Sequence, residues 1–202
     1  FEMWAGYSAR GGQTINPYGT GTDDMFVGDS STGAAIAVAA NFTVLSVGTE
    51  TDASILSPAV QSSVVGIKPT VGLISRRGII PFTYSQDTAG PFARTVTDAA
   101  ILLGSLTGVD EKDVATHKSE GMAYEDYTSY LDVNGLKGAK IGVYSNAPKD
   151  YYENGEYDEN LFENTIQVLR SEGATVVENI DIPSFHREWS WGVPLYELKH
   201  SL

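Results

Sequence analysis

The first half of the chain predicts a helix and two strands that are buried on all sides. Residues 33–41 are small and apolar around the whole helical circumference, which predicts a helix packed against a sheet. Residues 44–47 and 63–67 form short apolar runs bounded by polar residues, and each predicts a buried strand.

A second helix is predicted after Thr95. The Thr95 hydroxyl stands where a helix N-cap needs an acceptor, and Asp98 follows three positions later, as in a capping box. Gly104 or Gly108 is expected to end this helix, because glycine tolerates the left-handed conformation of a C-terminal cap.

The second half predicts a strand, a helix and a strand in succession. Residues 140–144 and 174–177 are the strands. The helix covers 160–172, is followed by Gly173 as a C-cap, and carries apolar residues at Leu161, Phe162, Ile166, Val168 and Leu169. This order implies a parallel, right-handed crossover. The predicted class is therefore α/β, with a mixed, mostly parallel β-sheet flanked by helices.

Composition adds a division within the chain. Of its 202 residues 42% are hydrophobic, enough for a real core. Residues 1–105 carry eight acidic and five basic residues, whereas residues 106–202 carry 18 and eight. We therefore predict a core part over 1–105, and over 106–202 an acidic outer part of the same α/β domain.

The charge balance excludes several kinds of partner. A net charge of −13 repels phosphates, which argues against nucleic acid and against an anionic membrane surface. The sequence holds no run of about 18 apolar residues that could span a bilayer. Because cysteine is absent and only three histidines occur, we expect no disulfide, no cysteine nucleophile and no metal site.

The two ends of the sequence resemble interior segments. Phe1 begins no basic signal region, and residues 195–200 have the pattern of a continuing helix. We expect a fragment of a longer protein, truncated at both ends. A cytoplasmic location is the default expectation.

The densest group of small polar residues is 28–33, Gly-Asp-Ser-Ser-Thr-Gly, directly before the first predicted helix. Backbone N–H groups at a helix start, with hydroxyls around them, suit a developing negative charge. The alternative is a Ser/Thr-rich helix start without chemistry. Two known serine-enzyme patterns do not fit, because all three histidines follow Ser30 and Thr32 stands where a nucleophile elbow needs glycine.

A second group, Gly-Thr-Glu-Thr-Asp-Ala-Ser-Ile at 48–55, follows the strand at 44–47. Ser54 lies 24 positions after Ser30, so one helix and one strand could bring both loops to one end of a sheet. With no histidine nearby, a serine nucleophile needs another proton acceptor, of which a desolvated, neutral lysine is the usual one.

An ordered set of segments resembles the amidase signature family. These segments are 8–19, 28–41, 48–54, 64–81 and 85–100, so the similarity is dense over roughly residues 1–105. The resemblance implies a Ser–cis-Ser–Lys hydrolase that acts on a small-molecule amide without metal or organic cofactor. Ser54 matches the nucleophile that forms the acyl-enzyme. Ser30 matches the bridging serine, which lies beside a cis peptide and relays the proton.

The same resemblance implies an oxyanion hole. The backbone N–H groups of Thr51, Asp52, Ala53 and Ser54 match the family's oxyanion-hole loop.

Several positions depart from the family pattern. The family's catalytic lysine lies upstream of the bridging serine, but no lysine precedes Lys68, which matches a different motif. Asp29, Ala34 and Ala53 replace smaller or more polar residues, and residues 60–63 also differ. The Ala53 side chain is harmless if φ is negative there and strained if φ is positive.

These departures leave two alternatives to an amidase. One is a catalytically inactive relative or truncated product that acts as a binding or interaction protein. The other is the tRNA-dependent amidotransferase subunit of the same family. For the remaining conspicuous residues we predict structural roles: buried hydrogen bonding for Gln86, Asp87, Thr88 and Arg94, a solvated acidic loop at 150–159, and packing or subunit contacts for His186, Trp189 and Trp191.

Overall fold

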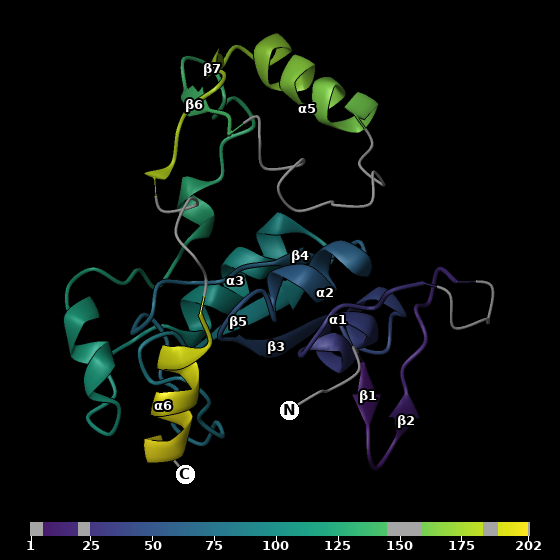
Figure 1. The fold of residues 1–202 in the computed structure, drawn as a ribbon. Helices are drawn as coiled ribbons and strands as arrows, with labels where there is room; N and C mark the ends of the chain where they lie inside the picture. Colours follow the sequence, from purple (N-terminus) through teal and green to yellow (C-terminus); the bar gives the residue numbers. More distant parts are fainter. Residues whose placement is uncertain (1–5, 20–24, 145–158, 184–189, 202) are drawn as a thin grey trace. The chain divides into compact units, whose positions relative to one another are not determined.

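A computed structural model describes residues 6–19, 25–144, 159–183 and 190–201, with the elements labelled in Figure 1. Contacts divide the chain into two compact units, which are described separately. The first comprises residues 1–129 together with 191–202, and the second comprises residues 130–190.

The first unit is built on a three-stranded antiparallel sheet with the strand order β3-β5-β4. Its strands are β3 (Leu45–Glu50), β4 (Val65–Gly66) and β5 (Thr88–Ala93). β5 pairs with β3 from Leu45 opposite Ala93 to Glu50 opposite Thr88, and with β4 through two further pairs. All six residues of β5 are buried, as the central position of this strand requires.

The α/β class is confirmed, but the expected parallel pairing does not occur in this sheet. β3 and β4 do run in the same direction, yet β5 lies between them and runs antiparallel to both. Gly90 and Pro91 lie in the middle of β5. Both residues ordinarily weaken a strand, which is why the sequence pattern did not predict β5.

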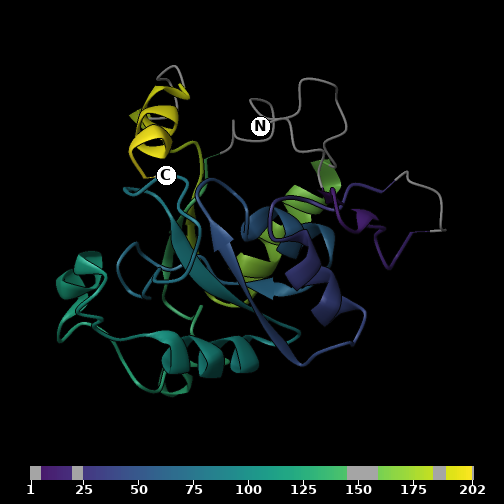
Figure 2. The same cartoon turned by 90° about the horizontal axis from the view of Figure 1, so that it is seen from below.

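Helices cover both faces of the sheet, because successive side chains of β5 point to opposite faces and pack against different helices. Phe92 packs in a cluster with α1 (Thr32–Ala39) and α2 (Leu56–Gln61), whose members are Ala35, Val38, Ile55 and Ala59. Ala89 packs with Ile74 and with Leu103 of α3 (Val96–Leu106). Positions 89 and 92 differ by an odd number of residues, so they point to opposite faces. α1 and α3 accordingly lie on opposite sides of the strands (Figure 2).

The N-cap of the capping box predicted for α3 is confirmed, while the Asp98 carboxylate accepts a hydrogen bond from the Thr95 hydroxyl at 2.7 Å. The Thr95 hydroxyl accepts a hydrogen bond from the Asp98 N–H at 3.1 Å. Of the two glycines expected to end this helix, Gly104 lies within it, whereas Gly108 directly follows the C-cap Thr107 and has a φ of 148°. A Cβ on Gly104 would lie 2.2 Å from the Glu125 carbonyl oxygen, so this glycine permits a chain crossing.

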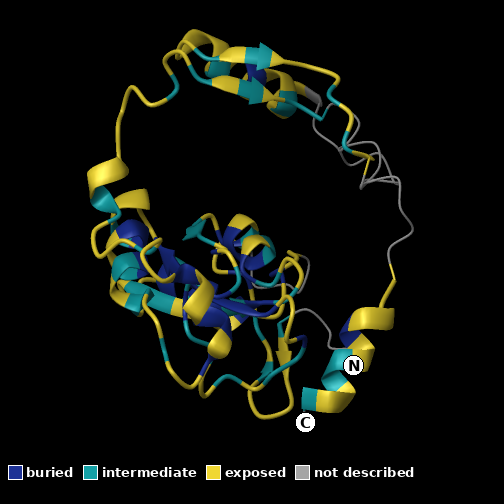
Figure 3. Cartoon of the chain, turned by 90° about the vertical axis from the view of Figure 1, so that its left-hand side faces the viewer, coloured by how far each residue is buried: buried dark blue, intermediate teal, exposed yellow. Residues whose placement is uncertain are grey.

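The second unit contains the predicted strand-helix-strand segment. β6 (Lys140–Gly142) and β7 (Thr175–Val177) pair in parallel, with α5 (Glu159–Ser171) between them in sequence. Gly173 follows α5 with a φ of 91°, as expected for a C-cap. Among the described residues of the second unit only Ile166 is buried, whereas many residues are buried in the sheet and helices of the first unit (Figure 3).

The remaining elements are short. β1 (Tyr7–Ser8) and β2 (Gly12–Gln13) form a hairpin, and η1 (Val114–Ser119) and η2 (Thr128–Tyr130) are 3-10 turns. α6 (Gly192–Ser201) is the last helix. None of the helices within the described ranges has the length and apolar character needed to cross a membrane.

Candidate active site

Ser30 lies in the turn that leads into α1, and the peptide bond between Asp29 and Ser30 is cis. This confirms the cis peptide that the family resemblance implies. Gly28 has a φ of 72°, and a Cβ there would lie 2.5 Å from the backbone nitrogen of Pro58. Only glycine therefore lets this turn approach the start of α2 so closely. Asp29 and Ser30 are both exposed, so the turn is open to solvent.

Residues 51–54 form the loop between β3 and α2, and Glu50 organises the start of that helix. The Glu50 side chain is buried, and its Oε2 accepts hydrogen bonds from the N–H groups of Ile55 at 2.7 Å and Leu56 at 2.9 Å. The N–H groups of residues 51–54, by contrast, donate to none of the residues that the structure describes. Unpaired N–H groups that point from one turn can stabilise a developing oxyanion.

Ser31 joins the two loops. Its N–H donates to the Ser54 carbonyl oxygen at 3.2 Å. Its hydroxyl donates to the Thr49 carbonyl oxygen at 2.8 Å and accepts from the Thr49 N–H at 3.0 Å. A Cβ on Gly48 would lie 2.7 Å from this hydroxyl, so glycine makes room for it. The prediction that one helix and one strand bring the loops of Ser30 and Ser54 together is confirmed.

Ser54 is half-buried at the end of its loop. Its hydroxyl is 3.4 Å from the Asp52 carbonyl oxygen, a long contact that leaves it accessible for other bonds. Ala53 has a φ of 58°. Of the two alternatives given for this residue from the sequence, the positive φ applies, so its Cβ is strained.

Asp87, the residue just before β5, supports the same loop. The residue is 7% exposed, and its Oδ1 accepts a hydrogen bond from the Thr51 hydroxyl. Its Oδ2 accepts from the N–H groups of Phe82 at 2.7 Å and Thr83 at 2.9 Å. The predicted buried hydrogen bonding is thus confirmed for Asp87.

The other three residues of that prediction differ in outcome. Arg94 is exposed, so burial was a wrong prediction for it. Its guanidinium nevertheless donates to the carbonyl oxygens of Val38 at 3.0 Å and Thr43 at 3.1 Å, and so fixes the end of α1. Thr88 is buried and hydrogen-bonded, as predicted. Gln86 is exposed, because it lies in the turn before β5 rather than in the sheet, so burial was a wrong prediction for it.

Lys68 lies apart from this chemistry. Its ammonium donates to the Pro69 carbonyl oxygen at 3.2 Å, and no contact among the described residues joins it to Ser30 or Ser54. Among the residues that the structure describes, no group of three or more histidines, aspartates or glutamates is placed to hold a metal ion.

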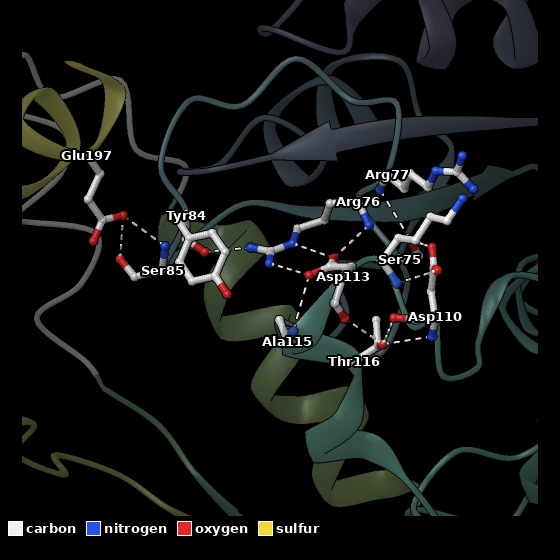
Figure 4. A network of polar contacts seen from close by, with 11 residues as sticks. Ser75, Arg76, Arg77, Tyr84, Ser85, Asp110, Asp113, Ala115, Thr116 and Glu197 are labelled. Carbon is white, nitrogen blue, oxygen red and sulfur yellow. Dashed lines mark hydrogen bonds and ion pairs between the residues drawn. The ribbon is translucent and has the colours of Figure 1, made fainter. Parts of the chain in front are cut away.

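A separate polar network, drawn in Figure 4, ties distant loops of the first unit together. Arg76 donates to Asp113 through its backbone N–H, its Nε and its Nη2, at 2.9, 2.9 and 2.8 Å. These bonds hold the pKa of Asp113 well below its usual range, and they raise the pKa of Arg76. The guanidinium carbon lies 4.7 Å from the ring centroid of Tyr84, close enough for a cation–π contact.

α6 is fixed beside this network by Glu197. Its carboxylate accepts from the N–H of Ser85 at 2.8 Å and from the Ser85 hydroxyl at 3.0 Å (Figure 4). Trp191, just before α6, meets the ring of Phe82 edge to face at 6.4 Å. His186, Trp189 and positions 150–158 of the predicted acidic loop lie outside the described residues.

Three contacts that shape the site were not predicted from the sequence. The cap formed by Glu50 could have been inferred from an acid placed before a helix start, but α2 is short and contains Pro58. The bond between Thr51 and Asp87 depends on the register of β5, and the bridge made by Ser31 depends on the packing of α1 against β3. Neither leaves a local sequence signal.

The chain is similar to several known proteins. A model of the Amidase family matches residues 2–201. A probable amidase of Arabidopsis thaliana is 44% identical over 185 residues, which cover 91% of this chain and 33% of the relative. A glutamyl-tRNA(Gln) amidotransferase subunit of Carboxydothermus hydrogenoformans is 42% identical over 173 residues, covering 85% of this chain and 33% of the relative.

A solved structure shows the same fold. Native peptide amidase from Stenotrophomonas maltophilia superposes with a TM-score of 0.78 at 49% identity, over 86% of this chain and 34% of the enzyme. The chain thus spans about a third of the length of the curated relatives it matches.

Proposed function

The chain belongs to the amidase family, and we propose that the protein hydrolyses the C–N bond of a carboxylic amide through an acyl-enzyme on Ser54. One observation carries this proposal. Ser54 ends a loop whose N–H groups have no hydrogen-bond acceptor among the residues that the structure describes, and a direct hydrogen bond ties that loop to the residue after Ser30. A nucleophile, a second hydroxyl and donors for an oxyanion are thereby gathered at one end of the sheet.

In the proposed reaction the Ser54 oxygen attacks the amide carbonyl carbon as its proton passes to Ser30. The carbonyl oxygen becomes an oxyanion, which the N–H groups of residues 51–54 stabilise. The C–N bond then breaks, the amine leaves with a proton, and an ester remains on Ser54. Water cleaves this ester to the carboxylic acid and restores the serine.

The proton must go beyond Ser30, because a serine hydroxyl is a weak base. A lysine held neutral by desolvation suits this role. No lysine precedes Lys68 in the sequence, so the proposal assigns the role to a lysine outside these 202 residues. The substrate class is a carboxylic amide of small-molecule or peptide size, in keeping with the likeness to a peptide amidase.

The strained Ala53 favours a second candidate function. If the loop of residues 51–54 is held too far from ideal geometry, the protein would bind amides without turning them over. The likeness to amidotransferase subunits also allows a partner protein.

Labelling with a fluorophosphonate serine probe, read by intact mass, tests the proposal in the full-length protein. We expect one adduct on the unmodified protein and on Ser105→Ala, a control that removes an exposed hydroxyl on α3. Ser54→Ala should carry none and should hydrolyse no amide. An adduct that persists in Ser54→Ala would refute the assignment, and a folded protein without any adduct would favour the binding function.

A further inference from the structure

Asp87 is a buried carboxylate whose hydrogen bonds come from backbone and hydroxyl groups rather than from a cation. Neither ion pair found among the described residues includes it. Its Oδ2 takes two backbone N–H groups at 2.7 and 2.9 Å, and the N–H of Asp87 itself donates to the Thr83 carbonyl oxygen at 2.8 Å. The carboxylate is therefore fixed in orientation, and Oδ1 is left to receive the Thr51 hydroxyl.

This contact lies where the ladder between β3 and β5 stops. Glu50 opposite Thr88 is the last backbone pair. Thr51 directly follows β3 and Asp87 directly precedes β5, so each lies one residue beyond the end of its strand. A bond between their side chains continues the pairing by one step. It also fixes the first residue of the loop at 51–54, whose other end is fixed by the bond from Ser31 to Ser54.

We infer that Asp87 is a positioning residue, which acts through the Thr51 hydroxyl to orient the N–H groups of the nucleophile loop. The inference rests on the proposed function. Donors aimed at an oxyanion stabilise the transition state only if they are held in place before the reaction. A displacement of about 1 Å can lower a rate by as much as 10²-fold.

The role predicts a particular kinetic effect. The N–H groups matter most when the carbonyl oxygen has become negative, so a loosened loop should lower kcat and leave KM nearly unchanged. A contact that serves only the fold would lower the stability of the protein and leave kcat per folded molecule intact.

Two substitutions at Thr51 test this in the full-length protein. Thr51→Val keeps the shape and the backbone N–H and removes only the hydroxyl, and we expect kcat to fall roughly 10- to 100-fold with KM within about two-fold. Thr51→Ser restores the hydroxyl and should recover most of the lost kcat.

Thr116→Val is the matched control. Thr116 is fully buried, and its hydroxyl donates to the Asp113 carbonyl oxygen at 2.7 Å, in a loop apart from the serines. This variant should shift the urea midpoint without changing kcat. If Thr51→Val keeps its kcat, or if Thr51→Ser loses as much as Thr51→Val, the inference is wrong. Loss of turnover in Ser54→Ala would leave the proposed function standing in either case, whereas turnover by Ser54→Ala would overturn the function itself.

Discussion

Two residues that flank α2 have backbone conformations that favour glycine. Ala53 has a φ of 58° and Ser63 a φ of 51°. In this left-handed region the Cβ of an L-residue crowds the following carbonyl oxygen, at a cost of roughly 1–2 kcal/mol per residue. The segment between them contains the candidate nucleophile, so the strain borders the site.

Ala53→Gly should therefore stabilise the protein. Relief of the Cβ contact exceeds the added freedom of glycine in the unfolded chain, and we expect the free energy of unfolding to rise by up to about 1 kcal/mol. Urea unfolding followed by circular dichroism measures it. Ala37→Gly, in the interior of α1, should instead lose about 0.5–1 kcal/mol. Equal losses in both variants would contradict the strain at position 53.

At the level of single residues the sequence could predict the chemistry but not its geometry. The segments at 28–41 and 48–54 were enough to select Ser30 and Ser54 and to imply the cis peptide. Whether Ala53 is strained depends on the sign of one dihedral angle, which the sequence leaves open. The bond from Thr51 to Asp87 spans 36 positions and arises only when β5 pairs with β3.

Among the elements, β5 is held where its sequence would not suggest a strand. A Cβ on Gly90 would lie 2.1 Å from the Ile67 carbonyl oxygen, so the neighbouring chain passes directly over this residue. That chain is itself fixed, because the Ile67 N–H donates to the Pro91 carbonyl oxygen at 3.1 Å. The glycine and the proline are thus requirements of the packing.

Gly90→Ala should destabilise the fold, since the fixed backbone cannot move away from an added methyl group. We expect a loss of about 1–3 kcal/mol, as for other overpacked cores. Thermal or urea unfolding gives the value. Gly33→Ala is the counterpart in α1, where an added Cβ meets nothing within 4 Å, and it should gain roughly 0.5–1 kcal/mol. If Gly90→Ala is as stable as the unmodified protein, the backbone at Ile67 can move to make room for the added methyl group.

The helices were predicted more successfully than the sheet, for a physical reason. α1, α3 and α5 carry their own signals in small residues, caps and apolar spacing. A strand is defined by its neighbours, and the partners of β5 on β3 lie 38 or more positions away, at Glu50 and before it.

For the molecule as a whole, the ion pair of Arg76 and Asp113 links pH to stability. Because the pKa of Asp113 is lowered in the folded state, chiefly by the hydrogen bond from Arg76, the unfolded chain takes up this proton first as the pH falls. The ion pair contributes fully to the free energy of unfolding above the pKa of an aspartate in the unfolded chain, about 3.9. This contribution is lost progressively as the pH falls below that value.

Unfolding free energies measured by urea titration between pH 7 and pH 2.5 test this linkage. The unmodified protein should lose stability steeply below about pH 4. Asp113→Asn should be less stable at pH 7 by roughly 3 kcal/mol, because Arg76 is left half-buried without its partner, and should show a shallower acid limb. Glu111→Gln, at an exposed position of the same loop, should follow the unmodified protein. If all three proteins lose stability equally steeply below about pH 4, the ion pair of Arg76 and Asp113 does not cause the acid sensitivity.

The insertion of β5 between two earlier strands also sets an order of events during synthesis. Ribosomes add about 5–20 residues per second, so β3 leaves the ribosome seconds before the strand that will pair with it. During that interval β3 is an unpaired strand with apolar side chains, open to association with other nascent chains. The loop that carries Ser54 directly follows β3 in the chain. The proposed site can accordingly be completed only after β5 has left the ribosome, and chaperone supply during translation should govern the yield of folded protein more than its final stability.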